Sequence, residues 1–135
     1  MDARLWNIGV KVADVDAEVA FVVALGGQVL IRDRLPTSDG DVEYALVQLG
    51  DTRVFLTPKP IFEDRLEAPV APGLTHAVFE VPNLEREVER LTALGTQVLL
   101  PPMEISAAFG SRRIAFFRSP GGLVFEVMEI QASLV

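Results

Sequence analysis

The sequence contains no cysteine, only one histidine, and no apolar run of the length that a membrane span requires. The absence of cysteine excludes disulfides, thiol catalysis and thiolate metal sites. The apolar segment Val19–Leu25 is too short to span a bilayer and is followed by two glycines. The first residues, MDARLW, lack an apolar signal core, so no secretory peptide is predicted and the cytoplasm is the expected location.

Basic residues are in the minority, with 12 against 19 acidic residues and a net charge of −7. Nucleic-acid binding depends on Lys and Arg contacts to phosphate, so this charge argues against a nucleic-acid partner. It is compatible with a cationic ligand, although solubility alone is the simpler interpretation. With 135 residues, of which 50% are hydrophobic and 23% charged, the chain is expected to form one compact domain, 1–135.

The chain carries an internal repeat, in which each residue of the segment that starts at Leu5 matches the residue 69 places later without a gap. Such a duplication predicts a pseudo-twofold structure with its site on or between the two copies. One matched pair differs in a chemically important way, because Asn7 corresponds to His76, the only histidine. Identities occur at Leu5/Leu74, Val12/Val81, Glu18/Glu87, Val19/Val88, Ala24/Ala93, Leu25/Leu94, Gly26/Gly95, Gln28/Gln97, Val29/Val98 and Leu30/Leu99.

Each copy opens with an alternating pattern that predicts a strand. In the first copy the apolar set from Trp6 to Val12 is expected to pack against helices, and Asn7 falls on the opposite face. In the second copy His76 and Glu80 fall on the corresponding face, toward a cleft or solvent.

A helix is expected after each opening strand. Asp14 and Asn83 are suited to cap the helix starts, and Gly26 and Gly95 are suited to end the helices in the left-handed region. The first helix is unusually apolar over 19–23, which predicts burial on two sides or a place at a subunit interface.

Three further strands fit after each helix, so each copy is predicted to be a βαβββ module. The modules are expected over 5–57 and 74–130, joined by a proline-rich, ordered or semi-rigid connector over 58–73. The expected strands are Gln28–Arg34, Glu43–Leu49 and Arg53–Thr57 in the first copy, and Gln97–Glu104, Arg112–Arg118 and Leu123–Glu129 in the second.

Two segments of the second copy, GLTHAVFEVPNLE and FGSRRIAFFRSPGGLVFEVME, resemble the vicinal oxygen chelate superfamily. That group includes glyoxalase I, bleomycin-resistance proteins, fosfomycin-modifying enzymes and extradiol dioxygenases, and the resemblance covers almost the whole chain. It implies an α+β fold of two tandem βαβββ modules, whose curved mixed sheets surround a U-shaped cleft. The chain departs from the family at the closing turn, where Ser119 replaces the usual aspartate.

The resemblance also implies four positions for a metal site, namely Asn7, a residue near Phe55, His76 and Glu126. Alternation favours Phe55 for the second position, whereas an ungapped alignment of the two VF pairs favours Leu56, and neither can bind a metal. His76, Glu126 and the amide oxygen of Asn7 together resemble a facial triad in which one histidine is replaced, and they would accept Mn, Fe, Ni or Zn.

Other readings of these residues stay open. His76 is also suited to a structural role, and Asn7 to a hydrogen bond with His76 or water. Phe55 is expected to be a cleft wall. Phe109 and Arg113 match a family pattern that borders the cleft, where Arg112 or Arg113 would bind a carboxylate or phosphate, although a solvated strand end is the simpler interpretation.

Two functions are therefore expected, both with a small-molecule ligand, a homodimer, and neither nucleic acid nor membrane as a partner. The first is a metal-dependent lyase, isomerase or dioxygenase that acts on a small oxygenated metabolite, with Glu126 as a catalytic residue. The second is a metal-free, antibiotic-sequestering protein of the bleomycin-resistance type. The second is favoured by the net charge, by Phe55 at a ligand position and by Asn7 in place of a histidine.

Overall fold

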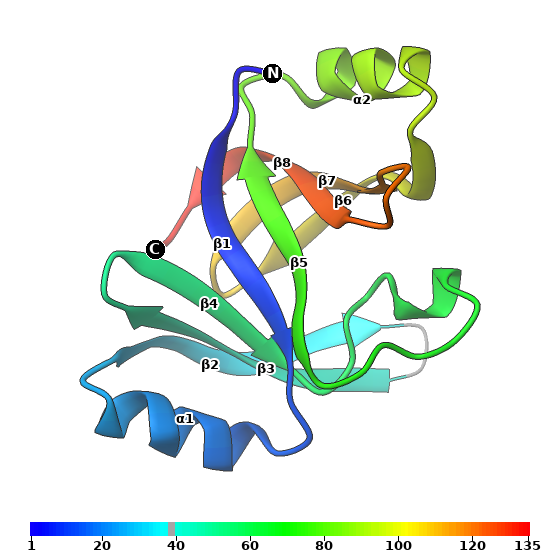
Figure 1. The fold of residues 1–135 in the computed structure, drawn as a ribbon. Coiled ribbons are helices and arrows are strands. Elements are labelled where there is room, and N and C mark those ends of the chain that lie inside the picture. The colour runs from blue at the N-terminus through cyan, green and yellow to red at the C-terminus, as the bar shows by residue number, and fades with distance from the viewer. Residues whose placement is uncertain (38–39) are drawn as a thin grey trace. The chain divides into compact units, whose positions relative to one another are not determined.

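The structure is a computed structural model that describes residues 1–37 and 40–135 (Figure 1). The predicted pair of βαβββ modules is confirmed. Neither of the two α-helices in this described part has the length and hydrophobicity needed to cross a bilayer. The elements are β1 (Arg4–Lys11), α1 (Val15–Ala24), β2 (Gln28–Thr37), β3 (Gly40–Leu49), β4 (Thr52–Thr57), the 3₁₀ turn η1 (Glu63–Arg65), β5 (Gly73–Glu80), α2 (Leu84–Ala93), β6 (Gln97–Ala107), β7 (Gly110–Arg118) and β8 (Val124–Ser133).

The chain divides into two compact units, each built around one module. One unit is Asn7–Thr75, and the other combines Met1–Trp6 with His76–Val135. The sheet of the first unit has the order β2-β3-β4-β1, and the sheet of the second has the order β5-β8-β7-β6. In each sheet the first and last strands of the module are parallel neighbours, and the other pairs are antiparallel.

Each helix covers one face of its own module's sheet. In the first module, Val15 and Val22 of α1 form a buried cluster with apolar residues of β3 and β4. In the second, Leu84 of α2 packs on residues of β7 and β8, including Phe117 and Val127. Burial of these side chains is the main source of stability for each module.

The helix ends follow the predicted capping. The side chain of Asp14 accepts a hydrogen bond from the Ala17 amide at 3.1 Å, and Asn83 caps α2 in the same way. Gly26 and Gly95, just beyond the two helices, have φ of 99° and 79°, the left-handed region that glycine adopts at low cost.

The connector is hydrogen-bonded to β1. Lys11 Nζ donates to Glu63 Oε2 at 2.6 Å and to the carbonyl oxygen of Val70 at 2.9 Å. Glu63 Oε2 also accepts a hydrogen bond from the Val70 amide, and the neighbouring Phe62 is fully buried. This ion pair is largely desolvated, because the two side chains are only 17% and 9% exposed.

The hairpin of β6 and β7 extends further than predicted, and so does β8. In the observed register Gly110 pairs with Ser133, so β8 continues past Glu129 for as long as β7 offers backbone partners. Gly110 has a φ of 115°, and a Cβ added there would lie 2.0 Å from the carbonyl oxygen of Ala132. The close approach of these two strands therefore depends on the absence of a side chain at position 110.

We expect Gly110→Ala to lower the free energy of unfolding by at least about 2 kcal/mol, because the added Cβ combines an unfavourable φ with a backbone clash. Urea unfolding monitored by circular dichroism measures this change. Gly121→Ala is the matched control, since Gly121 has an ordinary φ and no atom within 4 Å of an added Cβ. Equal stability of the two variants would contradict the prediction.

Candidate functional site

The second module brings two of the predicted site residues together. Val78 of β5 is in parallel register with Glu126 of β8, and His76 lies two residues earlier on the same face of β5. His76 Nε2 lies 3.8 Å from Glu126 Oε1. The two side chains are only 8% and 13% exposed, so this polar pair is largely removed from solvent.

Phe116 of β7 provides the apolar wall beside this pair. It is in register with Glu126, and its ring centroid lies 5.5 Å from that of His76 at a tilt of 58°. Charges and dipoles interact more strongly in such an apolar environment than in water. The pair is therefore suited to act on a bound group from which water is excluded.

The alternation predicted for β5 is confirmed. Phe79 and Val81 pack into the cluster beneath α2, so His76 lies on the face of the sheet that α2 does not cover. Glu80 follows on the same face, where its carboxylate accepts a hydrogen bond at 2.5 Å from the more exposed Arg4.

The strand register of the first module identifies the counterpart of Glu126. Gly9 is the repeat of Val78, and Gly9 is in register with Phe55 just as Val78 is in register with Glu126. Leu56 instead belongs to the core beneath α1. Phe55 is therefore the counterpart of Glu126, as alternation favoured.

An aromatic pair takes the place of a carboxylate in the first module. The rings of Phe55 and Tyr44 are stacked, with centroids 5.0 Å apart and planes inclined by 15°. Tyr44 is fully buried. This face of the first module thus offers an apolar, aromatic surface instead of a metal ligand.

Asn7, the counterpart of His76, is buried in the first module with 5% of its surface exposed. Its side-chain nitrogen donates to the carbonyl oxygen of Ile8 at 3.2 Å. This bond fixes the amide plane and engages the nitrogen, so the amide oxygen is the atom with which Asn7 would bind a cation.

Neighbouring residues Arg112 and Arg113 point to opposite faces of β7. Arg113 forms an ion pair with Glu85 in the first turn of α2, so it lies on the helix-covered face, opposite to His76 and not on the face predicted for it. Arg112 is 2% exposed, and a solvated strand end, the simpler interpretation from the sequence, is wrong for this residue.

The buried guanidinium of Arg112 holds three chain segments together. It donates to the carbonyl oxygens of Phe109 at 2.9 Å, Ser111 at 3.2 Å and Ala132 at 2.8 Å. It also lies over the rings of Trp6 and Phe109, at 5.3 Å and 5.2 Å from their centroids. Phe109, predicted as a cleft residue, therefore has a packing role against Arg112. No side-chain motif signalled this contact, because its acceptors are backbone atoms.

Comparison with known families identifies the chain. The model of the Glyoxalase/Bleomycin resistance protein/Dioxygenase superfamily matches residues 4–127. The chain belongs to this superfamily. A comparison with curated protein sequences gives no match.

Several solved structures have the same fold, although their sequence identity to this chain is low. A hypothetical protein, BH1468, from Bacillus halodurans C-125 has a TM-score of 0.76 at 22% identity, with 100% of this chain and 99% of that chain covered. Methylmalonyl-CoA epimerase from Mycobacterium tuberculosis has a TM-score of 0.69 at 20% identity, with 95% and 88% covered. A mutant of 4-hydroxymandelate synthase from Streptomyces coelicolor has a TM-score of 0.74 at 16% identity, with 99% and 50% covered. At these identities the likeness establishes the fold.

Metals are common in the superfamily, and the donor atoms of the second module fit one in part. Among residues 1–37 and 40–135, no group of three or more His, Cys, Asp or Glu side chains is suited to hold a metal ion. His76 and Glu126 nevertheless supply one nitrogen and one oxygen donor, 3.8 Å apart. Two donors that each bind an ion at about 2.0–2.2 Å lie up to about 4 Å apart, so this pair can share one ion.

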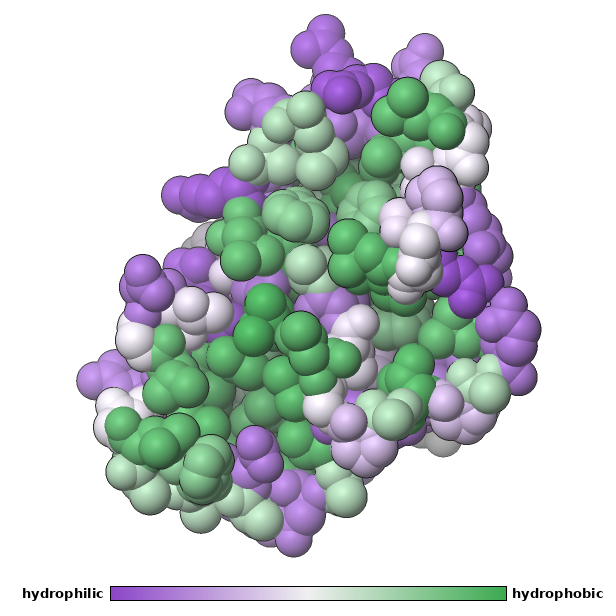
Figure 2. Space-filling model, viewed as in Figure 1, coloured by the Kyte–Doolittle hydropathy of each residue, from purple (hydrophilic) through white to green (hydrophobic). Residues whose placement is uncertain are grey.

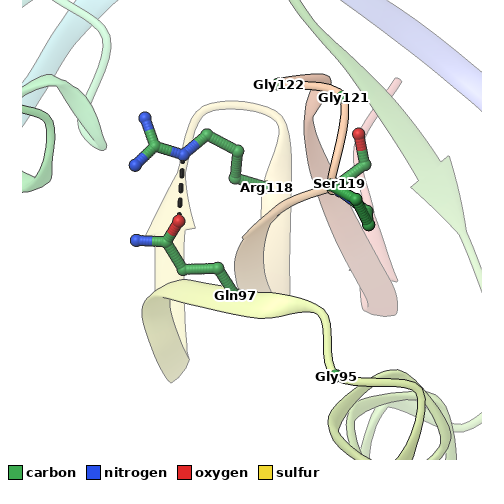
Figure 3. A pocket seen from close by; sticks show the side chains of 7 residues that line it. Gly95, Gln97, Arg118, Ser119, Gly121 and Gly122 are labelled. Atoms are coloured by element: carbon green, nitrogen blue, oxygen red, sulfur yellow. Dashed lines mark hydrogen bonds between the residues drawn. The ribbon is translucent and has the colours of Figure 1, made fainter.

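The second module of this superfamily member also contains an open pocket of about 470 Å³, away from the predicted site residues (Figure 3). It lies between the end of α2 and the SPGG turn, and Arg118 Nε donates there to Gln97 Oε1 at 3.0 Å. Ser119 holds the turn, since its hydroxyl oxygen accepts a hydrogen bond from the Leu123 amide at 3.0 Å. The serine that replaces the family's aspartate therefore has a structural role.

We expect Arg112→Lys to lower the free energy of unfolding by about 2–4 kcal/mol, because an ammonium group lacks the planar fork that reaches several carbonyl oxygens. Arg113→Lys is the control, and its partly exposed ion pair with Glu85 predicts a loss of less than about 1 kcal/mol. Chemical denaturation of the two variants measures the difference. A loss as large for Arg113→Lys as for Arg112→Lys would show that the buried guanidinium has no special role.

Proposed function

We propose that this superfamily member is a divalent-metal-dependent enzyme that acts on a small oxygenated metabolite, with His76 and Glu126 as metal ligands. The observation that carries the proposal is the 3.8 Å approach of these two side chains on a buried face of the second module. Imidazole nitrogen and carboxylate oxygen are the ligand types that Mn, Fe, Ni and Zn accept. The sequence repeat matches Asn7 of the first unit to His76, but the proposed ligand pair lies wholly within the second unit.

Such a ligand set suits substrates that carry two adjacent oxygens. Two protein ligands leave several coordination positions open, and the bound ion would act as a Lewis acid toward substrate oxygens. His76 would bind through Nε2, the nitrogen that faces Glu126. The ring of Phe116 would exclude water from one side of the group that these residues hold.

The composition of the site narrows the reaction class. An isomerase that moves a proton with two bases needs a second carboxylate, and Phe55 stands at the position that corresponds to Glu126. Glu126 alone can accept and return a proton. Lyase or dioxygenase chemistry is therefore favoured over two-base isomerisation.

Metal titration tests this proposal. We expect the protein to bind about one equivalent of Mn²⁺ or Zn²⁺ in isothermal titration calorimetry. His76→Ala and Glu126→Gln should each weaken binding by about tenfold or more, equivalent to at least about 1.4 kcal/mol, because each removes one of few ligands. Glu80→Gln is the matched control, since Glu80 lies on the same face of the same strand and is bound to Arg4. Absence of binding, or equal binding by all variants, would refute the assignment.

A metal-free ligand-binding protein is the second candidate, favoured by the stacked pair of Tyr44 and Phe55 at a ligand position. Aromatic faces attract cations, and the net charge of −7 would add long-range attraction for a cationic drug. The superfamily's name includes bleomycin-resistance proteins. This candidate needs no contribution from His76 as a metal ligand.

A thermal-shift experiment with bleomycin in the presence of a chelator separates the two candidates. Sequestration of the drug would raise the melting temperature. Phe55→Ala would weaken drug binding by about 0.5–2 kcal/mol, and the rise in melting temperature would be smaller. His76→Gln should leave that shift unchanged. The metal-dependent enzyme that we propose should give no shift with saturating drug, so a shift that depends on Phe55 would favour the second candidate.

A further inference from the structure

Helix α1 is apolar on both of its sides, although only one side is buried in the module. Val15 and Val22 are buried against the sheet. Away from the sheet, Phe21 and Leu25 are 57% and 56% exposed on one flank of α1, and Val23 is 51% exposed on the other. A helix that is apolar all round is usually covered on all sides, so the outward side of α1 lacks the polar residues expected of a surface helix.

The second helix provides an internal comparison for these outward residues. The repeat matches Ala20, Phe21 and Val23 of α1 with Glu89, Arg90 and Thr92 of α2. Both helices still pack on their sheets through residues at equivalent positions, such as Val22 and Leu91. Folding of the module therefore does not require apolar residues at positions 20, 21 and 23, although Leu25 has an apolar and 72% exposed counterpart in Leu94.

The exposed apolar residues gather on α1 and on the strand that follows it. Figure 2 shows hydrophobic side chains gathered over α1, at the lower left of the view. Val29 of β2, 41% exposed, adds to this surface, since its register partner Val47 belongs to the cluster beneath α1. We call the surface formed by Ala20, Phe21, Val23, Ala24, Leu25 and Val29 the α1 patch.

We propose that the α1 patch is the surface through which two copies of this chain associate. The proposal goes beyond the reaction proposed above and does not depend on it. Each of three features of the patch fits a second copy of the chain: its charge, its shape and its area.

The charge of the patch favours self-association. Each copy carries a net charge of −7, so two copies repel each other wherever their acidic residues face one another. The patch contains no ionisable side chain, and the last turn of α1 contains no basic residue. A partner chosen by charge complementarity has nothing to bind within the patch, whereas an identical apolar surface can be buried there, with the acidic residues of the first turn of α1, Asp16 and Glu18, at its margin.

The shape of the patch is suited to a twofold contact of α1 with itself. Phe21 and Leu25 are four residues apart and form a ridge, and the neighbouring small residues Ala20 and Ala24 form a groove beside it. Interlocking of such i±4 ridges and grooves is the commonest packing of two helices in globular proteins. A twofold axis requires each copy to offer both surfaces, and α1 offers them side by side.

The area of the patch is sufficient for a stable dimer. From the exposed fractions of its side chains, the patch leaves on the order of 400 Å² of apolar surface per copy, the size at which exposed patches mark interaction sites. If both patches were fully covered, the dimer would bury about 800 Å² of apolar surface in total. This equals the apolar part of the smallest interfaces that hold stable complexes together.

Disulfide trapping tests the proposal, and the absence of native cysteine makes the result easy to interpret. We expect Ala20→Cys or Ala24→Cys to form a disulfide-linked dimer under mild oxidation, because helix contact brings equivalent positions within disulfide reach. The controls are Glu89→Cys and Ala93→Cys, the repeat positions on α2, which should stay monomeric in non-reducing gels. Equal cross-linking on both helices, or none on α1, would overturn the proposal.

The mass in solution provides a second test. We expect the native chain to have twice its mass of 14.7 kDa in light scattering, and the double variant Phe21→Arg with Val23→Thr to have the single mass. The variant places on α1 the residues that α2 already carries, so it should fold, and its circular dichroism spectrum checks this. Leu94→Lys is the control at the repeat position of Leu25. A native monomer, or a dimer that the double variant leaves intact, would overturn the proposal.

Discussion

The parallel pairing of the first and last strands within each module is the constraint on which the candidate site depends. His76 and Glu126 are far apart in the sequence, and only the alignment of β5 with β8 brings them within 3.8 Å. Parallel neighbours cannot be joined by a tight turn, so the helix and two strands between them form the crossover that the pairing requires. The helix that completes this crossover also covers one face of the sheet, which leaves the other face for the polar pair.

The same pairing in the first module carries different chemistry. Phe55 occupies the position of Glu126, and it is stacked on the buried Tyr44. A carboxylate at this position would need a metal or a hydrogen-bond donor to offset its desolvation, whereas the ring of Phe55 is stabilised by stacking on Tyr44. The register thus pairs an aromatic residue of the first module with the carboxylate of the second, so only the second module has the two donors of the proposed metal site.

Alternation and the repeat predicted much of this arrangement, including both modules, both helix caps and the choice of Phe55 over Leu56. The same alternation, continued from the buried Ala115 and Phe117, also indicates that Arg113 faces α2, whereas the prediction from the family pattern did not use it. Burial of Arg112 was not predictable, because its acceptors are backbone carbonyl oxygens of segments whose side chains give no sign of the contact.

The two copies together separate the requirements of the fold from those of function. Residues that the fold needs have the same character in both copies, such as Val22 and Leu91 in the cores or Gly26 and Gly95 at the helix ends. Where the two copies have chemically different residues, the fold does not dictate the residue type, because one module folds with one residue and the other module folds with the other. His76 and the outward residue Phe21 both stand at such positions, opposite Asn7 and Arg90. The differences fall in different modules, which agrees with the two proposals: metal ligands in the second module and a contact surface on the first.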